Sequence, residues 1–326
     1  MVTLVNAVSE NRSLCDYISS EDMAAYIRAC HAEGVEFIRY GTDDRKIIRP
    51  DMAVGCHLIF YSDWVDFWRG NEAALRRKFG SPETVHSVFS AKNRDEFIAQ
   101  FKADMDYAES MGVKYAVFHV SDVSLEEGFT YKWEHTDKDV IDASAELLNI
   151  LTDGTRYSFA ILLENLWWKG FSMTDPDLTR YMLDKIHYEN KGIMLDTGHL
   201  MNTNRQLKSQ QEACDYIHRI LDIHGNLCEL ISGVHLHASI TGQYVEKSFL
   251  NIPAPEGDFT KRFSQAYRHI LNIDTHQPFT APGVGALVER ISPDYLVYEL
   301  SAPDKQKKIE LCDSQYRALN RHAEFS

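Results

Sequence analysis

The chain has 326 residues, of which 44% are hydrophobic and 25% are charged, which is the composition of a soluble globular protein. Its formal net charge of −14 repels phosphate backbones, so nucleic acid is a disfavoured partner. No segment reaches the roughly 18 apolar residues of a membrane span, and the N-terminus lacks the pattern of a secretory signal. The six cysteines form no C-x-x-C pair. We therefore expect a cytoplasmic protein with reduced thiols and no membrane contact.

Short β-branched and aromatic runs alternate with longer helical patterns along the chain, which is typical of parallel β/α units. The stretch 93–112 shows the helical period, with Phe97, Phe101, Met105 and Ala108 on one face. In chain order, the predicted strands are 3–9, 35–40, 52–60, 115–120, 158–165, 192–196, 232–238 and 295–300. The predicted helices are 21–33, 64–79, 93–112, 138–152, 175–188, 208–225, 258–272 and 304–321.

Eight strands that alternate with helices over this length predict an α/β fold, a closed (β/α)8 TIM barrel, as a single domain over residues 1–326. The alternative is an open doubly wound sheet. Neither G-x-G-x-x-G nor G-x-x-x-x-G-K-[ST] follows any predicted strand, so the usual phosphate-binding loop of an open sheet is missing. The longest interval, about 239–294, predicts a loop and helix insertion after strand seven, at the face where barrel enzymes gather their active-site loops.

Six consecutive predicted strands carry a histidine or an acidic residue near their carboxyl ends. Such residues are unusual in apolar runs unless a partner compensates their desolvation, and a divalent cation does this for carboxylates and neutral imidazoles together. Each residue alone has a structural explanation, such as a hydrogen-bonded histidine or a helix N-cap. Those explanations would have to hold on six neighbouring strands at once, so we predict a metal site. The six residues are His57, His119, Glu164, Asp196, His235 and Glu299.

This order of residues resembles the xylose-isomerase-like TIM-barrel superfamily, which includes sugar isomerases and epimerases, inosose dehydratases and endonuclease IV. The resemblance extends from the first strand to the eighth. Its most specific pieces are LLEN (162–165), LDTGH (195–199), VHLHAS (234–239) and LVYEL (296–300).

The resemblance implies a ligand set. In the epimerase branch, one divalent ion is held by four residues that match Glu164, Asp196, His235 and Glu299. The endonuclease IV branch adds two histidines, which match His57 and His119, and a second ion bridged by Glu164. We expect one or two ions per chain, which would be manganese, zinc, magnesium, cobalt or iron (Mn, Zn, Mg, Co or Fe).

The same branch builds a third metal site from the histidine of Asp-x-x-His and an Asp-x-His after strand seven. His199 matches the first, but the segment HASITGQYVEKSFLNIPAPEG after His235 contains no Asp-x-His. We therefore do not expect a complete three-metal site. The stretch DTHQPF (274–279) carries His276, whose place the sequence does not fix.

Three kinds of chemistry fit such a site. In a metal-dependent sugar or sugar-phosphate isomerase or epimerase, which we favour from the sequence, Glu164 and Glu299 would be the acid/base pair beside a metal-polarised carbonyl. The alternatives are an endonuclease-IV-like binuclear metallohydrolase, a phosphoesterase that does not act on duplex DNA, and an iron-dependent oxidative enzyme. A non-catalytic barrel is disfavoured because none of the four epimerase-type ligands is missing.

We also expect contacts with a small carbohydrate-like substrate. The candidate substrate-binding residues are His199, His237, Trp167 and Lys247. Aromatic faces pack on the C–H faces of sugars, although core packing is the alternative for a tryptophan and a solvated surface position the alternative for a lysine. Association into a homo-oligomer stays open.

Overall fold

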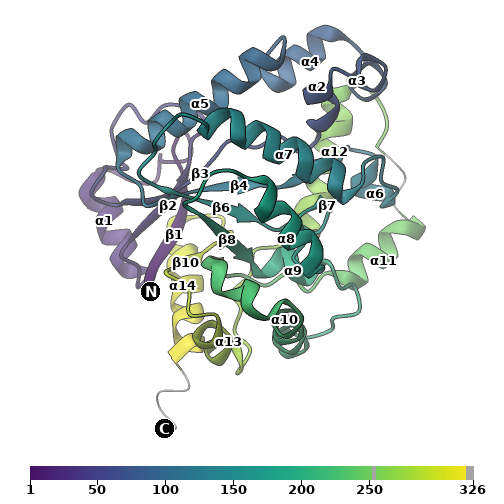
Figure 1. Cartoon of the computed structure of the whole chain (residues 1–326). Helices are drawn as coiled ribbons and strands as arrows, with labels where there is room; N and C mark the ends of the chain where they lie inside the picture. Colours follow the sequence, from purple (N-terminus) through teal and green to yellow (C-terminus); the bar gives the residue numbers. More distant parts are fainter. Residues whose placement is uncertain (252–254, 321–326) are drawn as a thin grey trace.

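Eight parallel strands close into a barrel, which confirms the predicted (β/α)8 TIM-barrel class (Figure 1). The computed structural model describes residues 1–251 and 255–320. Around the barrel the strands follow the order β1-β10-β9-β8-β6-β4-β3-β2. They are β1 (Val2–Val8), β2 (Gly34–Ile38), β3 (Ala53–His57), β4 (Tyr115–His119), β6 (Ala160–Glu164), β8 (Lys191–Asp196), β9 (Ile231–His235) and β10 (Tyr295–Tyr298).

Helices surround the barrel in Figure 1, and most begin where the sequence predicts a start. Side chains of Ser19, Asn93, Thr136 and Asp175 accept hydrogen bonds from the first turns of their helices, which is the usual N-cap. The helices that match predicted ones are α1 (Ser20–Ala29), α5 (Arg94–Met111), α7 (Asp137–Thr152), α8 (Pro176–Lys185), α10 (Gln210–His224), α12 (Phe259–Ile273) and α14 (Lys305–Asn320). Position 321 of the last predicted helix lies outside the described residues.

The single helix predicted over 64–79 is wrong, because the chain forms two helices there. The first, α2 (Val65–Arg69), ends at Gly70, whose φ of 66° is left-handed and costs glycine little. The second, α3 (Glu72–Phe79), begins at Asn71, whose side chain accepts a hydrogen bond from Ala74. A third short helix, α4 (Pro82–Phe89), follows.

Further short elements lie in the connections. The connections between barrel strands hold β5 (Ser121–Asp122), α6 (Glu127–Thr130), β7 (Lys169–Gly170), α9 (Thr197–Asn202) and the 3-10 helix η1 (Gly225–Leu230). The interval 239–294, which the sequence predicts as an insertion, holds α11 (Gly242–Asn251), α12 and α13 (Val284–Ile291), and its residues 252–254 lie outside the described part of the chain. In the described residues, every helix is too short or too polar to cross a bilayer.

Strand register aligns the carboxyl ends of the strands that carry histidine or acidic residues. His119 of β4 lies beside Glu164 of β6, and Asp196 of β8 lies beside His235 of β9. Val297 of β10 is also paired with His235, so the chain after β10 leads directly to the same end of the barrel. The hydrogen-bond ladder therefore fixes the polar residues as a ring at one mouth.

Inside the barrel, one tyrosine lies across the strands in space that a glycine leaves open. A Cβ atom on Gly55 would lie 2.3 Å from Tyr115 Cζ, so a larger residue would displace the ring. The Tyr115 hydroxyl donates to Glu36 at 2.8 Å. The surrounding apolar layer consists of Leu4, Val117, Leu162, Met194 and Val297. This layer is the floor below the polar mouth.

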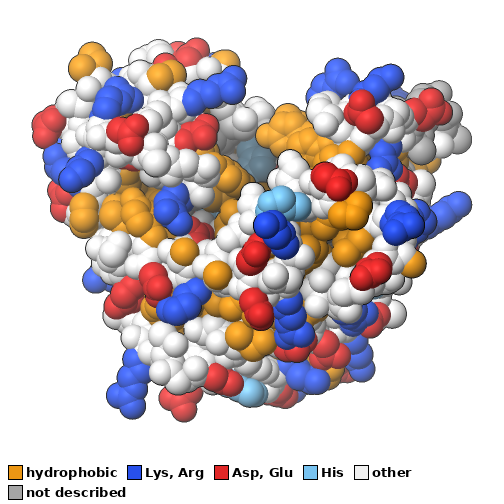
Figure 2. All heavy atoms as spheres, turned by 90° about the horizontal axis from the view of Figure 1, so that it is seen from above, with side chains coloured by type: hydrophobic (Ala, Val, Ile, Leu, Met, Phe, Trp, Pro, Cys, Tyr) orange, Lys and Arg blue, Asp and Glu red, His pale blue; other side chains and the backbone are white. Residues whose placement is uncertain are grey.

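Charged side chains join the connections after β3, β4 and β9, and those within the connection after β3 are buried. Lys78 Nζ of α3 lies 2.6 Å from Asp63 Oδ1 and 2.8 Å from Asp66 Oδ2. Burial alone would lower the pKa of Lys78, but these carboxylates outweigh it and raise the pKa. Arg262 of α12 binds both Glu126 and the backbone carbonyl of Lys78. Figure 2 shows the molecule hollowed between two lobes, with hydrophobic side chains exposed along the hollow.

Replacement of Lys78 by methionine should destabilise the fold strongly, because Asp63 and Asp66 would be left buried without their cation. We expect a loss of about 3–5 kcal/mol in the free energy of unfolding, measured by urea denaturation. The matched control is Lys102→Met, which removes an exposed partner of Asp106 and should change little. A loss below about 1 kcal/mol for Lys78→Met would contradict the role of this pair.

Candidate metal centre

Three groups of ligand-type side chains adjoin one another at the barrel mouth. The first group is His57, His119 and Glu164; the second group is Glu164, Asp196, His235 and Glu299; the third group is His199, His237, Asp274 and His276. The structure thus brings together all six strand-end residues singled out from the sequence, and their role as ligands stays a prediction.

In the first group, two histidines face one carboxylate oxygen. His57 Nε2 lies 3.3 Å and His119 Nε2 3.2 Å from Glu164 Oε2. The other ring nitrogen of His57 lies 2.8 Å from the Leu58 carbonyl, to which it donates. Because Nδ1 carries the proton in that tautomer, Nε2 of His57 offers its lone pair toward Glu164 and His119.

In the second group, three carboxylates surround one histidine nitrogen, two from the ends of β6 and β8 and one from the residue directly after β10. His235 Nδ1 lies 3.1 Å from Glu299 Oε2, 3.4 Å from Glu164 Oε2 and 3.7 Å from Asp196 Oδ2. Asp196 is also the N-cap of α9, since it accepts a hydrogen bond from the His199 backbone at 2.6 Å. Asp196 therefore caps α9 through Oδ1, and Oδ2, which faces His235, stays available for the predicted role as a ligand.

The third group corrects the expectation that no Asp-x-His follows strand seven. Asp274-Thr275-His276 is such a motif, and it lies later in the chain than the segment directly after His235. Asp274 Oδ2 lies 3.3 Å from His199 Nε2 and 3.4 Å from His276 Nδ1. The His276 ring stacks on the His237 ring at 4.1 Å. The ligand-type residues of a third site are therefore all present in this chain.

A loop contact explains why this motif reaches the barrel mouth. Backbone hydrogen bonds join Ala238 and Gln277 in both directions, at 2.7 and 3.2 Å. They hold residues 274–277 against the chain that leaves β9. His276 has a positive φ of 45°, a conformation that histidine adopts more readily than most residues. The sequence does contain the signal, which is the Asp-x-His spacing, but it does not show that this motif lies at the barrel mouth.

The donor set fits divalent cations. Within the described part of the chain, four buried atoms that face into the cluster make no hydrogen bond of regular geometry, although three of them lie within ion-pair distance of one another: Glu164 Oε2, His235 Nδ1, Glu299 Oε2 and, as the fourth, His237 Nδ1. A buried polar atom without a partner costs about 1–3 kcal/mol. Cations that accept both imidazole nitrogen and carboxylate oxygen, such as Zn²⁺, Mn²⁺ or Fe²⁺, would satisfy all four.

Electrostatics within the cluster are strongly coupled. Burial alone would lower the pKa of His235, but the charges of Glu299, Glu36 and Glu164 outweigh it and raise that pKa well above its usual value. The pKa of His199 is raised in the same way, chiefly by Asp196 and Asp274. Burial opposes ionisation of Glu164, yet the facing histidines hold its pKa well below the usual range. Without cations, the carboxylates are thus balanced by protons on imidazoles.

Glu36 is a residue of this site that the sequence did not reveal. It lies on β2, buried in the barrel, and its oxygens are 2.9 and 3.1 Å from His235 Nε2. The contact fixes the ring so that Nδ1 faces the second group, as carboxylates behind metal-binding histidines commonly do. The available signal was a glutamate between Val35 and Phe37 in an apolar strand.

The predicted substrate-binding residues lie in different surroundings. His199 and His237 are within the third group. The Trp167 ring lies 5.1 Å from the His199 ring and is only 7% exposed. Lys247 lies on the exposed face of α11. Contact of these four with a substrate stays a prediction.

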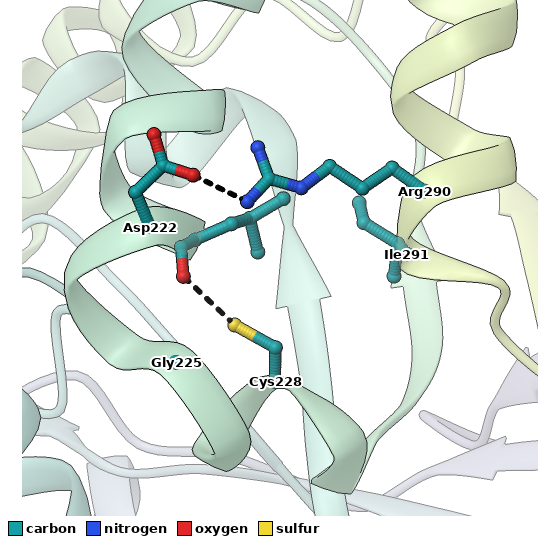
Figure 3. Close-up of a pocket in the computed structure, with 6 residues that line it drawn as sticks. Asp222, Gly225, Cys228, Arg290 and Ile291 are labelled. Atoms are coloured by element: carbon teal, nitrogen blue, oxygen red, sulfur yellow. Dashed lines mark hydrogen bonds and ion pairs between the residues drawn. The ribbon is translucent and has the colours of Figure 1, made fainter.

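A separate cavity of about 340 Å³ lies between α10, η1 and α13 (Figure 3). Arg290 there is paired with Asp222 at 2.5 Å and with His218, and the Cys228 thiol donates to the Leu221 carbonyl. Its polar groups satisfy one another, in contrast to those at the barrel mouth. The barrel mouth is therefore the stronger candidate for a functional site.

Residues 27–281 match the family model of the xylose isomerase-like TIM barrel, and the chain belongs to this family. Among solved structures, it is similar to a D-tagatose 3-epimerase-like protein, with a TM-score of 0.52, 14% identity, and coverage of 99% of this chain and 100% of that one. A putative xylose isomerase from Rhodospirillum rubrum ATCC 11170 gives a TM-score of 0.55, 12% identity and 98% coverage of both chains.

The IOLI protein with a binding zinc atom gives a TM-score of 0.52, 14% identity, and coverage of 98% of this chain and 97% of that one. At these identities the likenesses show the fold alone. No curated protein matches the chain in sequence. The family supports an enzyme, and its reaction is left to the chemistry of the site.

Replacement of Gly198 by alanine should disrupt the third group while leaving the barrel folded. A Cβ atom there would lie 1.9 Å from His237 Cε1, so the His237 ring would have to move. We expect fewer metal ions per chain, measured by elemental analysis after dialysis. Gly128→Ala is the matched control, because its Cβ would lie 3.7 Å from the nearest atom, Ile270 Cδ1. Full metal content in folded Gly198→Ala protein would contradict the third group as a ligand set.

Metal affinity should rise with pH. Because the pKa values of His199 and His235 are raised, both rings hold protons in the metal-free protein near neutral pH and must release them to bind an ion. Calorimetric titration with Zn²⁺ at about pH 6, 7 and 8 should show increasing affinity and proton release to the buffer. An affinity that does not change with pH would show that other groups bind the ion.

Proposed function

We propose that the protein is a multinuclear metal-dependent hydrolase that cleaves phosphoester bonds in small molecules. The observation that supports this is the presence of three adjoining ligand groups, in which Glu164 belongs to the first and second and Asp196 contacts the second and third. Clustered divalent ions in such sites activate water and stabilise charge on the attacking and leaving oxygens.

A one-metal isomerase would leave much of the cluster without a role. Four residues, those of the second group, suffice for one ion. The remaining ligand-type residues are His57, His119, His199, His237, Asp274 and His276, all at the same mouth. Because every buried imidazole or carboxylate carries a desolvation cost, this surplus favours more than one ion.

Among the carboxylates, Glu299 is the one that can reach a substrate. Its side chain is 18% exposed, against 1% for Glu164 and 0% for Asp196. Glu164 and Asp196 hold positions below it, so they orient the site and balance its charge. Glu299 is therefore the group that takes a proton from an entering hydroxyl or returns it to a leaving oxygen.

The walls of the mouth fit a small substrate. The Phe60 ring packs 4.5 Å from the His119 ring and 5.6 Å from the His57 ring, while Trp167 borders His199 on the other side. Aromatic walls close to the ligand groups restrict the space above them. Together with the net charge of −14, they support a small molecule rather than duplex nucleic acid.

Isomerisation or epimerisation is the second candidate, and one observation favours it. Glu164 and Glu299 both approach His235 Nδ1, from β6 and from the chain after β10. Two carboxylates so placed could exchange a proton with carbons on opposite faces of a sugar. An iron-dependent oxidation uses the same donor types, so the identity of the bound metal separates it from the hydrolase.

The test is metal analysis combined with turnover. Protein purified without added metal should contain two or three ions per chain and hydrolyse p-nitrophenyl phosphate or bis-p-nitrophenyl phosphate. His57→Ala should lose one ion and Glu299→Gln should lower kcat by about 100-fold or more. Ile223→Ala, at an exposed site on α10, is the control and should change neither quantity.

Two other outcomes would contradict the hydrolase, and they can be told apart. One ion per chain, unchanged in His57→Ala, together with epimerisation of a sugar would replace the hydrolase by the second candidate. Bound iron together with oxygen consumption would replace it by an oxidative enzyme.

A further inference from the structure

Beside the third group lies a second set of buried polar atoms without partners. Within the described residues, the Trp167 and Trp168 indole nitrogens and the Tyr131 hydroxyl are all buried, and none makes a hydrogen bond of regular geometry. Indole N–H groups only donate, so both indole nitrogens require an acceptor that the described residues do not place at hydrogen-bond distance with regular geometry. None of the three residues belongs to the ligand groups.

These three side chains are neighbours. The Trp167 and Trp168 rings lie 4.2 Å apart, and both pack with Tyr131 in one small apolar cluster around Val245 and Ile273. Trp167 also contacts the third group, since its ring lies 5.1 Å from that of His199. The unpaired donors therefore lie at the edge of the candidate metal centre, on the side of α9 and α11.

The cationic side chain of Arg205 lies at the more exposed side of this cluster. The Arg205 guanidinium lies 5.7 Å from the Tyr131 ring centre and 5.2 Å from that of Phe249. Burial raises the pKa of the Tyr131 hydroxyl to about 12, and a weak contact from the Trp167 indole N–H together with the charge of Arg205 partly offsets this rise. Arg205 pairs with Glu246 at 3.2 Å and keeps 39% of its side chain exposed. The surroundings thus combine neutral donors with a positive charge.

We propose that Tyr131, Trp167 and Trp168 form a subsite for an oxygen-rich anionic group of the substrate, such as a phosphate or a carboxylate. Two indole donors and a hydroxyl match the several acceptor oxygens of such a group, and Arg205 favours its charge. An apolar ligand would leave the donors unpaired. The inference rests on the proposed function in one respect: it makes the substrate a small molecule with an anionic group next to the bond that is cleaved.

Tryptophan fluorescence tests the subsite directly. The metal-loaded protein is titrated with inorganic phosphate, with acetate and with neutral glycerol, and the indole emission is followed. We expect saturable quenching by phosphate or acetate and none by glycerol. Trp168→Phe and Tyr131→Phe each leave an aromatic ring in place but remove the donor, so each should weaken anion binding about tenfold or more. Trp68→Phe is the control, because its indole nitrogen is already bonded to Glu146.

Metal content measured on the same samples separates this proposal from the proposed function. Unchanged phosphate affinity in folded, metal-loaded Trp168→Phe and Tyr131→Phe would overturn the subsite and leave the hydrolase standing. Glycerol binding as tight as that of phosphate would overturn its anionic character. Quenching that the donor variants remove, in a protein that binds no metal, would support the subsite while the hydrolase fails. If Trp168→Phe does not fold, Tyr131→Phe decides the outcome.

Discussion

The buried carboxylate of Glu164 is the group on which the barrel mouth depends. It is 1% exposed, and nitrogens of His57, His119, His199 and His235 lie between 3.1 and 3.4 Å from its oxygens. Removing an ionised carboxylate from water costs several kcal/mol, which apolar neighbours cannot offset. The four histidines come from β3, β4, α9 and the end of β9, so one charge fixes four separate segments. The position of Glu164 at the end of β6 thereby sets the geometry of all three ligand groups.

This constraint extends into the barrel interior. His235 can turn Nδ1 toward Glu164 because its Nε2 is held by Glu36, and Glu36 in turn accepts from the Tyr115 hydroxyl. Tyr115 lies across the barrel because Gly55 leaves room for its ring. An apolar core would be simpler to fold, since each buried polar group needs a partner. The interior instead contains a series of polar contacts that leads from Tyr115 through Glu36 to His235. Packing inside the barrel therefore helps to fix the orientation of His235 at the candidate site.

Much of this was predictable from the sequence, for physical reasons. Strand residues such as Glu164 and Asp196 could be found because parallel strands must end at one mouth, so chain order alone places them together. Asp274 and His276 could not be placed, because their position depends on the bridge between Ala238 and Gln277, which no local pattern encodes. Glu36 was hidden because a lone acidic residue in a strand gives no spacing signal. The split of 64–79 at Gly70 escaped prediction because a single glycine is tolerated within helical patterns.

Two buried acidic clusters in this chain are balanced in different ways. Around Asp63 and Asp66 the chain supplies its own permanent cation, the Lys78 ammonium at 2.6 and 2.8 Å, in addition to the His135 ring 3.5 Å from Asp66. Around Glu164, Asp196, Glu299 and Asp274, the ion pairs within the described part of the chain are all with histidine, a residue that can give up its charge near neutral pH. A permanent lysine or arginine cation would occupy the space where ligands converge and repel any metal. Imidazoles instead hold the carboxylates together by protonation and then release those protons when a stronger cation binds. The cluster around Lys78 is therefore suited to stabilising the fold, whereas the histidine-rich cluster at the barrel mouth is suited to binding a metal ion.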